Sequence, residues 1–235
     1  MRRIIVTGAN RGIGLAITRE YLENSTAQVF ATARNPQNAT DLHQLQGAYG
    51  DRLHLIPLDQ TDEASVNAAA DVVRERTDAM DVLINNAGMN MPGAEQKLDT
   101  LDIDALLHVM RVNVGGPLLV TRALRPLLAA GENAAIVNIS SQMGSMQWMT
   151  RGGNYAYSPS KAALNMVTRS MAADLNADGI TTVTVHPGWV QTDMGGPSAS
   201  LTPVESARGI VALTARLTPA HNGQFFRWDG TEHPW

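Results

Sequence analysis

A tyrosine and a lysine lie four residues apart in the sequence Tyr157-Ser158-Pro159-Ser160-Lys161. In a helix this spacing puts both side chains on one face, one turn apart. Proline is tolerated in the first turn of a helix, so Pro159 predicts that the pair lies near a helix N-terminus. A free phenol loses its proton at about pH 10, but a nearby lysine charge and the helix dipole favour the phenolate and lower its pKa. The pair could therefore exchange a proton near neutral pH, although the same spacing also occurs in surface pairs.

A glycine-rich turn follows a short β-branched run at the start of the chain. Ile4-Ile5-Val6 predicts a strand, and three glycines then lead into residues 15–22, which have helical apolar spacing. In such a unit Gly8 permits the tight turn, Gly12 lets the backbone approach a pyrophosphate, and Gly14 lets the helix pack on the strand. The Gly-x3-Gly-x-Gly spacing differs from the standard dinucleotide fingerprint, so the turn could also be purely structural.

Two arginines favour a phosphorylated dinucleotide. The second expected strand, 29–33, ends at Arg34, where NAD-binding sites usually place an acidic residue. Arg34 suits a 2′-phosphate through bidentate hydrogen bonds, and Arg11 in the glycine turn could reach the same phosphate. Both could instead be solvated surface residues. Asp59, at the end of the third expected strand, 53–58, could accept a hydrogen bond from an adenine amino group or act as a helix cap or turn residue.

Two further groups of amide side chains accompany these residues. The expected strand 81–84 runs into Asn85-Asn86-Ala87-Gly88, which suits a loop passing close to a ligand but is also ordinary for a turn. Asn113 lies among apolar residues in mid-helix, where an amide must find partners in a site or in the core. We expect Gly115-Gly116 to loosen or kink that helix and to free a backbone carbonyl.

The last two strand ends carry a serine pair and a Pro-Gly pair. The expected strand 134–139 ends in Ser140-Ser141, and residues 142–154 resemble a loop over a site. The expected strand 181–186 ends at Pro187-Gly188, which indicates a backbone that approaches another group closely. His186 has no cluster of ligand-type residues beside it and is interpreted as structural, so no metal site is predicted. Four residues are candidates for the substrate pocket, with core or interface packing as the alternative: Met143, Trp148, Trp189 and Met194.

Charge and composition limit the classes of partner. The 235-residue chain has a net charge of −4 and no block of like charges, so we expect neither nucleic-acid binding nor a membrane-surface helix. It has no cysteine, which excludes disulfides and thiolate metal sites and fits a reducing compartment. No signal peptide is expected and no run approaches a membrane span, so we predict a cytoplasmic protein with small-molecule partners.

Strands and helices alternate along the chain, which closes with a helix at 203–217 and a strand at 223–228. Because the strands are almost continuously apolar, this order predicts an α/β protein over residues 1–235, a single-domain doubly wound parallel sheet (Rossmann fold) with helices on both faces. Ligands bind at the carboxyl ends of the strands in such sheets. The candidate residues fall at successive strand ends, and this agreement outweighs the structural alternatives for each one alone.

Taken together, these motifs resemble those of the classical short-chain dehydrogenase/reductase family. The matching elements are, in chain order, Thr7-Gly8-x3-Gly12-x-Gly14, Asn85-Asn86-Ala87-Gly88, Asn113, Ser141, Tyr157-x3-Lys161, and Pro187-Gly188 with Thr192. Within the family, Asn10-Arg11, residues 140–145, residues 186–196 and Pro234-Trp235 are similar to the C-factor/sniffer-type carbonyl reductases.

The resemblance implies a role for each catalytic residue. Tyr157 is the general acid that protonates the carbonyl oxygen, and the base in the reverse direction. Lys161 holds the nicotinamide ribose and lowers the pKa of Tyr157. Ser141, rather than Ser140, hydrogen-bonds the substrate oxygen, and Asn113 binds a water of a proton relay behind Lys161. The implied cofactor is NADP(H), bound by Gly8, Asn10, Arg11, Gly12, Ile13, Gly14, Arg34, Asp59, Asn86, Ala87, Gly88, Tyr157, Lys161, Pro187, Gly188, Val190 and Thr192.

We therefore expect an NADPH-dependent oxidoreductase that reversibly reduces a ketone or aldehyde to an alcohol. One alternative is a cofactor-binding signalling or regulatory protein of C-factor type. Another is an NAD-dependent alcohol dehydrogenase, which Arg34 disfavours. The small, apolar helix that begins near Tyr157 is compatible with a homodimer or a homotetramer.

Overall fold

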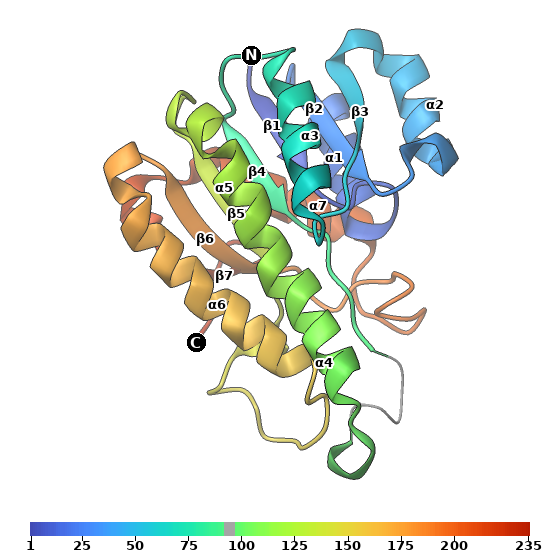
Figure 1. Ribbon diagram of the computed structural model, residues 1–235, viewed down its shortest axis with the longest axis vertical. Helices are drawn as coiled ribbons and strands as arrows, with labels where there is room; N and C mark the ends of the chain where they lie inside the picture. The colour runs from blue at the N-terminus through green and yellow to red at the C-terminus, as the bar shows by residue number, and fades with distance from the viewer. Residues whose placement is uncertain (92–96) are drawn as a thin grey trace.

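The computed structural model describes residues 1–91 and 97–235, and its strands form one seven-stranded sheet (Figure 1). The strands are hydrogen-bonded in the order β3-β2-β1-β4-β5-β6-β7, and every neighbouring pair is parallel. Their bounds are β1 Arg3–Val6, β2 Gln28–Ala33, β3 Leu53–Pro57, β4 Val82–Asn85, β5 Ala135–Ile139, β6 Thr181–His186 and β7 Phe225–Arg227. The α/β class and the doubly wound parallel sheet predicted from the sequence are confirmed, and the strand order reverses between β1 and β4.

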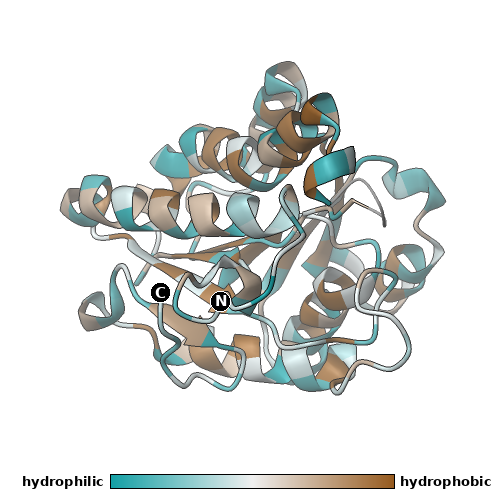
Figure 2. Ribbon diagram, turned by 90° about the horizontal axis from the view of Figure 1, so that it is seen from below, coloured by the Kyte–Doolittle hydropathy of each residue, from teal (hydrophilic) through white to brown (hydrophobic). Residues whose placement is uncertain are grey.

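Two layers of helices enclose the sheet (Figure 2). Helices α1, α2 and α7 contribute to one apolar core, and α3, α5 and α6 contribute to a second core on the other face. Helix α2 has no counterpart among the expected elements, because its ten residues bury only Leu42 and Leu45 and so give a weak apolar pattern. The helix bounds are α1 Gly12–Asn24, α2 Thr40–Tyr49, α3 Glu63–Arg74, α4 Ile103–Met110, α5 Gly116–Ala129, α6 Tyr157–Asp174 and α7 Pro203–Arg216.

Helices α4 and α5 are joined by a π-helical segment, Arg111–Gly115, into one long helix. By length and composition alone this helix, Ile103–Ala129, could cross a membrane, so the expectation that no run approaches a span was wrong. In the structure α5 packs against α3, and α4 packs against α6. Val109 and Leu124 are buried, but only 28% of the apolar window is buried, and Ile103, Leu107 and Leu118 are exposed.

The buried carboxylate of Asp81 forms hydrogen bonds that connect segments at the amino-terminal edge of the sheet. Asp81, directly before β4, accepts hydrogen bonds from Arg3 N at 2.7 Å, Arg3 Nε at 2.9 Å, Arg3 Nη2 at 2.7 Å and Glu132 N at 2.8 Å. These bonds tie together the start of β1, the start of β4 and the segment that precedes β5. The edge that carries them is opposite the carboxyl ends of the strands, where the candidate site lies.

Candidate active site

The tyrosine and lysine of the central pair begin helix α6. Tyr157 is its first residue, and Pro159 lies in its first turn, as the proline predicts. Both side chains are buried, and Lys161 Nζ lies 5.7 Å from the centre of the Tyr157 ring. Lys161 Nζ also donates a hydrogen bond of 2.9 Å to Ile139 O, at the end of β5. The pair therefore sits where α6 meets the carboxyl edge of the sheet.

The pKa of Tyr157 is raised, so the expectation of a lowered value was wrong for the protein alone. Burial raises the pKa of this phenol to about 12, and a hydrogen bond with Ser141 opposes the shift. Burial also lowers the pKa of Lys161 to about 8. Desolvation is the largest cause of both shifts, because both groups are buried. A phenol in this state is protonated at neutral pH and can donate its proton.

The two serines after β5 face different neighbours. Ser141 shares a hydrogen bond with Tyr157, and its Oγ accepts one of 3.1 Å from Met143 N. Ser140 Oγ instead donates to Asn165 Oδ1 at 2.7 Å, inside the contact between β5 and α6. Ser141 is therefore the serine that lies beside the phenol.

Asn113 is held in the π-helical segment by protein groups. Its Oδ1 accepts from Met89 N at 2.9 Å, and its Nδ2 donates to Met89 O and to Ser160 Oγ, each at 2.9 Å. Both amide hydrogens are used, so a water beside Asn113 can donate to this side chain but cannot accept from it. A Cβ at Gly88 would lie 3.2 Å from Asn113 Oδ1 and 3.5 Å from Lys161 Nζ. The absence of a side chain at Gly88 thus leaves room for both groups.

The glycine turn between β1 and α1 has the backbone that its sequence predicts. Gly8 and Gly12 have positive φ values of 63° and 56°. A Cβ at Gly14 would lie 2.3 Å from Gly8 O, so only glycine lets α1 approach the turn so closely. Asn86 Nδ2 fixes the turn from β4 by donating to Thr7 O at 2.9 Å and to Gly8 O at 3.1 Å. Among the described residues no side chain caps the N-terminus of α1, and its first turn has no acidic residue.

A cavity of about 750 Å³ runs along the carboxyl ends of the strands. It brings together most of the predicted cofactor residues and one predicted substrate residue: Gly8, Asn10, Arg11, Gly12, Ile13, Arg34, Asp59, Asn86, Ala87, Gly88, Tyr157, Lys161, Pro187, Thr192 and Met194. Three predicted cofactor residues are not part of its lining. Gly14 packs on Gly8, while Gly188 and Val190 pack against Leu201, and a Cβ at Gly188 would lie 2.3 Å from Leu201 Cδ1.

The charged residues of the cavity differ in exposure, and Lys161 is the buried one among the four named for the cofactor. Arg34 and Arg11 are exposed, and Arg11 Nη1 forms an ion pair with Asp193 in the segment that follows β6. Asp59 Oδ1 accepts hydrogen bonds from Thr61 N at 2.9 Å and Thr61 Oγ1 at 2.7 Å, and these bonds lower the pKa of the Asp59 carboxyl. Asp59 is therefore a turn residue that also lines the cavity, and the cap of α3 is Asp62.

Gln60 is a cavity residue that the sequence did not reveal. It is buried, and its Nε2 donates to Ala87 O at 3.1 Å and to Val112 O at 2.9 Å. The Val112 carbonyl belongs to the π-helical segment, which agrees with the loosened helix expected near Gly115-Gly116. A Cβ at Gly116 would lie 2.6 Å from Gln60 Cδ, so the second glycine makes room for Gln60. Gly116 indicates in the sequence that another group comes close to the helix, but that group, Gln60, lies far away along the chain.

The four predicted pocket residues lie in different places. Met194 lines the large cavity, and Met143 lines a second one beside α6. Trp148 and Trp189 line neither of these two cavities, and both are about half exposed, so their place in a substrate pocket stays a prediction. The ring of Trp148 lies 5.3 Å from that of His233, at the C-terminal end of the chain. Trp189 Nε1 donates to Gly195 O at 2.8 Å within its own loop.

Acidic and histidine side chains do not gather into a metal site in residues 1–91 and 97–235. His186, interpreted as structural, is buried beside His233, with 5.7 Å between the ring centres. Burial, together with the charges of His233 and Arg227, lowers the pKa of His186 to about 4. The imidazole is therefore neutral near pH 7.

The chain is similar to known proteins over its whole length. The family model described as "short chain dehydrogenase" matches residues 2–201. C-signal of Myxococcus xanthus is 47% identical over 159 residues, which cover 68% of this chain and 95% of C-signal. The NADPH-bound carbonyl reductase from chicken fatty liver is 38% identical with a TM-score of 0.93, covering 100% of this chain and 99% of that one. The carbonyl reductase Sniffer of D. melanogaster is 34% identical with a TM-score of 0.94, covering 100% of both chains.

These similarities agree with the motifs, with the strand order of the sheet, and with the resemblance to C-factor/sniffer-type carbonyl reductases. The protein is therefore an oxidoreductase of the short-chain dehydrogenase family.

Proposed function

We propose that the protein reduces ketones or aldehydes to alcohols with NADPH, and that Tyr157 is its proton donor. The observation that carries the proposal is the cavity of about 750 Å³, which has Arg34 and the glycine turn along its wall and Tyr157 and Lys161 in the same lining. One space thus joins groups suited to a phosphorylated dinucleotide with an acid suited to a carbonyl oxygen. The similarity of the chain to carbonyl reductases supports the proposal of this reaction.

The residues of the cavity fit NADP(H). The N-terminus of α1 lacks a side-chain cap among the described residues, and such a helix end suits a pyrophosphate. Arg34 and Arg11 would hold the 2′-phosphate, and Lys161 would hold the ribose next to the nicotinamide. When bound, the cofactor supplies the hydride that reduces the carbonyl carbon.

The protonation states of Tyr157 and Lys161 determine how the proton is transferred in the proposed reaction. Tyr157, whose pKa is about 12 in the free protein, gives its proton to the oxygen as negative charge develops there. Ser141, which is hydrogen-bonded to Tyr157, donates to the same oxygen and stabilises that charge. Lys161 is charged below about pH 8 and stabilises the phenolate that remains. Asn113 positions the loop after β4 and Ser160 of α6, and holds a water behind Lys161.

A panel of ketones, aldehydes and quinones tests the proposal, with NADPH oxidation followed by absorbance and alcohol products identified by chromatography. We expect turnover with NADPH and much weaker turnover with NADH. A protein that binds NADPH but turns over none of the panel would refute the proposal.

The likeness to C-signal favours a second candidate, a cofactor-binding protein with a signalling role. A protein that only binds a cofactor has no need of a buried acid hydrogen-bonded to a serine, so the Tyr157–Ser141 pair favours the enzyme. The same panel separates the two candidates, because a pure binding protein would give NADPH affinity without alcohol product.

A further inference from the structure

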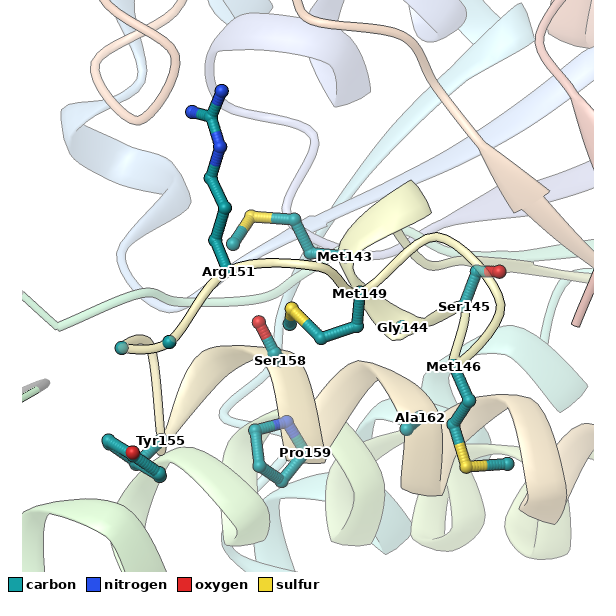
Figure 3. Close-up of a pocket in the computed structure, with 12 residues that line it drawn as sticks. Met143, Gly144, Ser145, Met146, Met149, Arg151, Tyr155, Ser158, Pro159 and Ala162 are labelled. Atoms are coloured by element: carbon teal, nitrogen blue, oxygen red, sulfur yellow. The ribbon is translucent and has the colours of Figure 1, made fainter. Parts of the chain in front are cut away.

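A second cavity shares no described lining residue with the large one, and its lining includes residues next to Tyr157 and close to Ser141 in the chain. It has a volume of about 260 Å³ and lies between the loop after Ser141 and the first turns of α6 (Figure 3). Its apolar lining comes from Met143, Met146, Met149, Tyr155, Pro159 and Ala162. This volume suits a substituent smaller than a drug-sized ligand.

The walls of this cavity are fixed by contacts to the rest of the fold. Gly144 lies against α6 so closely that a Cβ there would be 2.7 Å from Lys161 C. Trp235 O accepts hydrogen bonds from Ser145 Oγ at 2.9 Å and from Gln147 N at 3.1 Å. The loop is thus held at both the helix and the C-terminal segment, and the cavity exists without a ligand.

One polar group in the cavity has no partner. Ser158 is only 4% exposed, it lines the cavity, and its Oγ makes no hydrogen bond with any described residue. In Figure 3 its hydroxyl points from the first turn of α6 toward the loop that carries Met149. A buried hydroxyl without a partner destabilises a protein, and a ligand acceptor would satisfy it. The flexible Met149 side chain can move to admit such a ligand.

The position of the cavity relates it to the reaction. Ser158 follows Tyr157 directly in the first turn of α6, and Met143 N is hydrogen-bonded to Ser141 Oγ. Each proposed donor to the carbonyl oxygen is thus joined, by the chain or by a hydrogen bond, to a residue of the cavity lining. Arg151 is the one charged residue among the described residues of the lining, and it forms no ion pair within the described chain. A cationic substituent is therefore disfavoured.

We propose that this cavity is the subsite for the carbonyl substituent, and that it selects neutral or anionic apolar groups carrying an oxygen acceptor for Ser158 Oγ–H. The proposal rests on the proposed function and names the substrate class: ketones or aldehydes with an aryl or alkyl group that contains an ether or carbonyl oxygen. Ser158 is then a specificity-determining residue, separate from the proton donor beside it.

A matched pair of ketones tests this assignment. In 4-propylacetophenone and 4-(methoxymethyl)acetophenone one CH2 is exchanged for an ether oxygen at equal length, and isomers with the oxygen moved along the chain complete the series. We expect the best-placed ether to exceed its alkyl counterpart in kcat/KM by about five- to tenfold, as one neutral hydrogen bond allows. Ser158→Ala should remove this preference, and Ser170→Ala, an exposed position on the same helix, should keep it.

The outcomes distinguish the subsite from the reaction. If the ratio of kcat/KM for the ether ketone to that for the alkyl ketone is equal in the wild type and in Ser158→Ala, the subsite is overturned. It is also overturned if Ser158→Ala lowers kcat/KM by the same factor for the ether ketone, the alkyl ketone and the small aldehyde propanal. If no carbonyl compound is turned over, the proposed function fails. The subsite is then tested separately, by calorimetric measurement of the binding of the same ketones to the NADPH complex. A dissociation constant about tenfold weaker in Ser158→Ala supports the subsite, and equal constants refute it. Because the unpartnered hydroxyl destabilises the ligand-free protein, Ser158→Ala should melt no lower than the wild type.

Discussion

Replacing Asp81 with alanine should destabilise the fold strongly without touching the active site. The carboxylate is 2% exposed and accepts four hydrogen bonds, three from Arg3 and one from Glu132 N. Asp81→Ala leaves the Arg3 guanidinium, only 26% exposed, without its carboxylate. Removing one partner of a buried ion pair lowers the free energy of unfolding by about 3–5 kcal/mol. For a chain of this size that corresponds to a fall in Tm of roughly 6–20 °C.

Urea unfolding followed by far-UV circular dichroism measures this loss. Asp71→Ala is the matched control, because its ion pair with Arg74 on α3 is exposed and stabilises by no more than about 0.5 kcal/mol. At 20 °C the folded Asp81→Ala protein should keep its kcat, since Asp81 lies at the opposite edge of the sheet from Tyr157. Equal stability of the two variants would refute the role given to the buried carboxylate.

Three other predictions concern the cofactor and the effects of pH. Arg34→Ala should weaken NADPH binding by about ten- to a hundredfold through the loss of a charge-assisted contact, with little change for NADH, and equal losses in titrations with both cofactors would remove the phosphate assignment. The kcat/KM for reduction should fall above about pH 8 as Lys161 loses its charge, while Tyr157 stays protonated, and a profile flat to pH 10 would contradict this. The pKa of His186 is lowered from 6.5 to about 4 in the folded protein, so as the pH falls the imidazole is protonated in the unfolded chain before it is protonated in the folded one. The free energy of unfolding should therefore fall by about 3 kcal/mol between pH 6.5 and pH 4. His186→Gln should reduce this acid sensitivity in urea titrations, whereas His43→Gln, at an exposed position on α2, should leave it unchanged.

Local patterns in the sequence predicted the strands and their ends well. The β-branched run before Gly8 and the proline after Tyr157 each depend on steric rules within a few residues, and the structure follows them. The serine pair after β5 could also be placed at the sheet edge. These features are local, so one sequence is enough to read them.

What could not be predicted depends on residues distant in the chain. The direction of the Tyr157 pKa shift follows from burial, which the whole fold creates and the Tyr-Lys spacing does not reveal. Trp148 packs with His233 from the C-terminal segment, and nothing near Trp148 in the sequence indicates that contact. Gln60 fits against Gly116 of α5, and nothing near Gln60 in the sequence indicates that contact.

The proton donor is the central claim, and Tyr157→Phe tests it most directly, since the exchange removes one hydroxyl and keeps the ring. Steady-state reduction of the best carbonyl substrate and fluorescence titration with NADPH would be measured on the same samples, with Tyr49→Phe on α2 as the matched control. We predict that kcat falls by about 10²–10⁴ in Tyr157→Phe while NADPH affinity changes little, because the hydroxyl acts on the substrate oxygen. An undiminished kcat in Tyr157→Phe would contradict the assignment of Tyr157 as the acid.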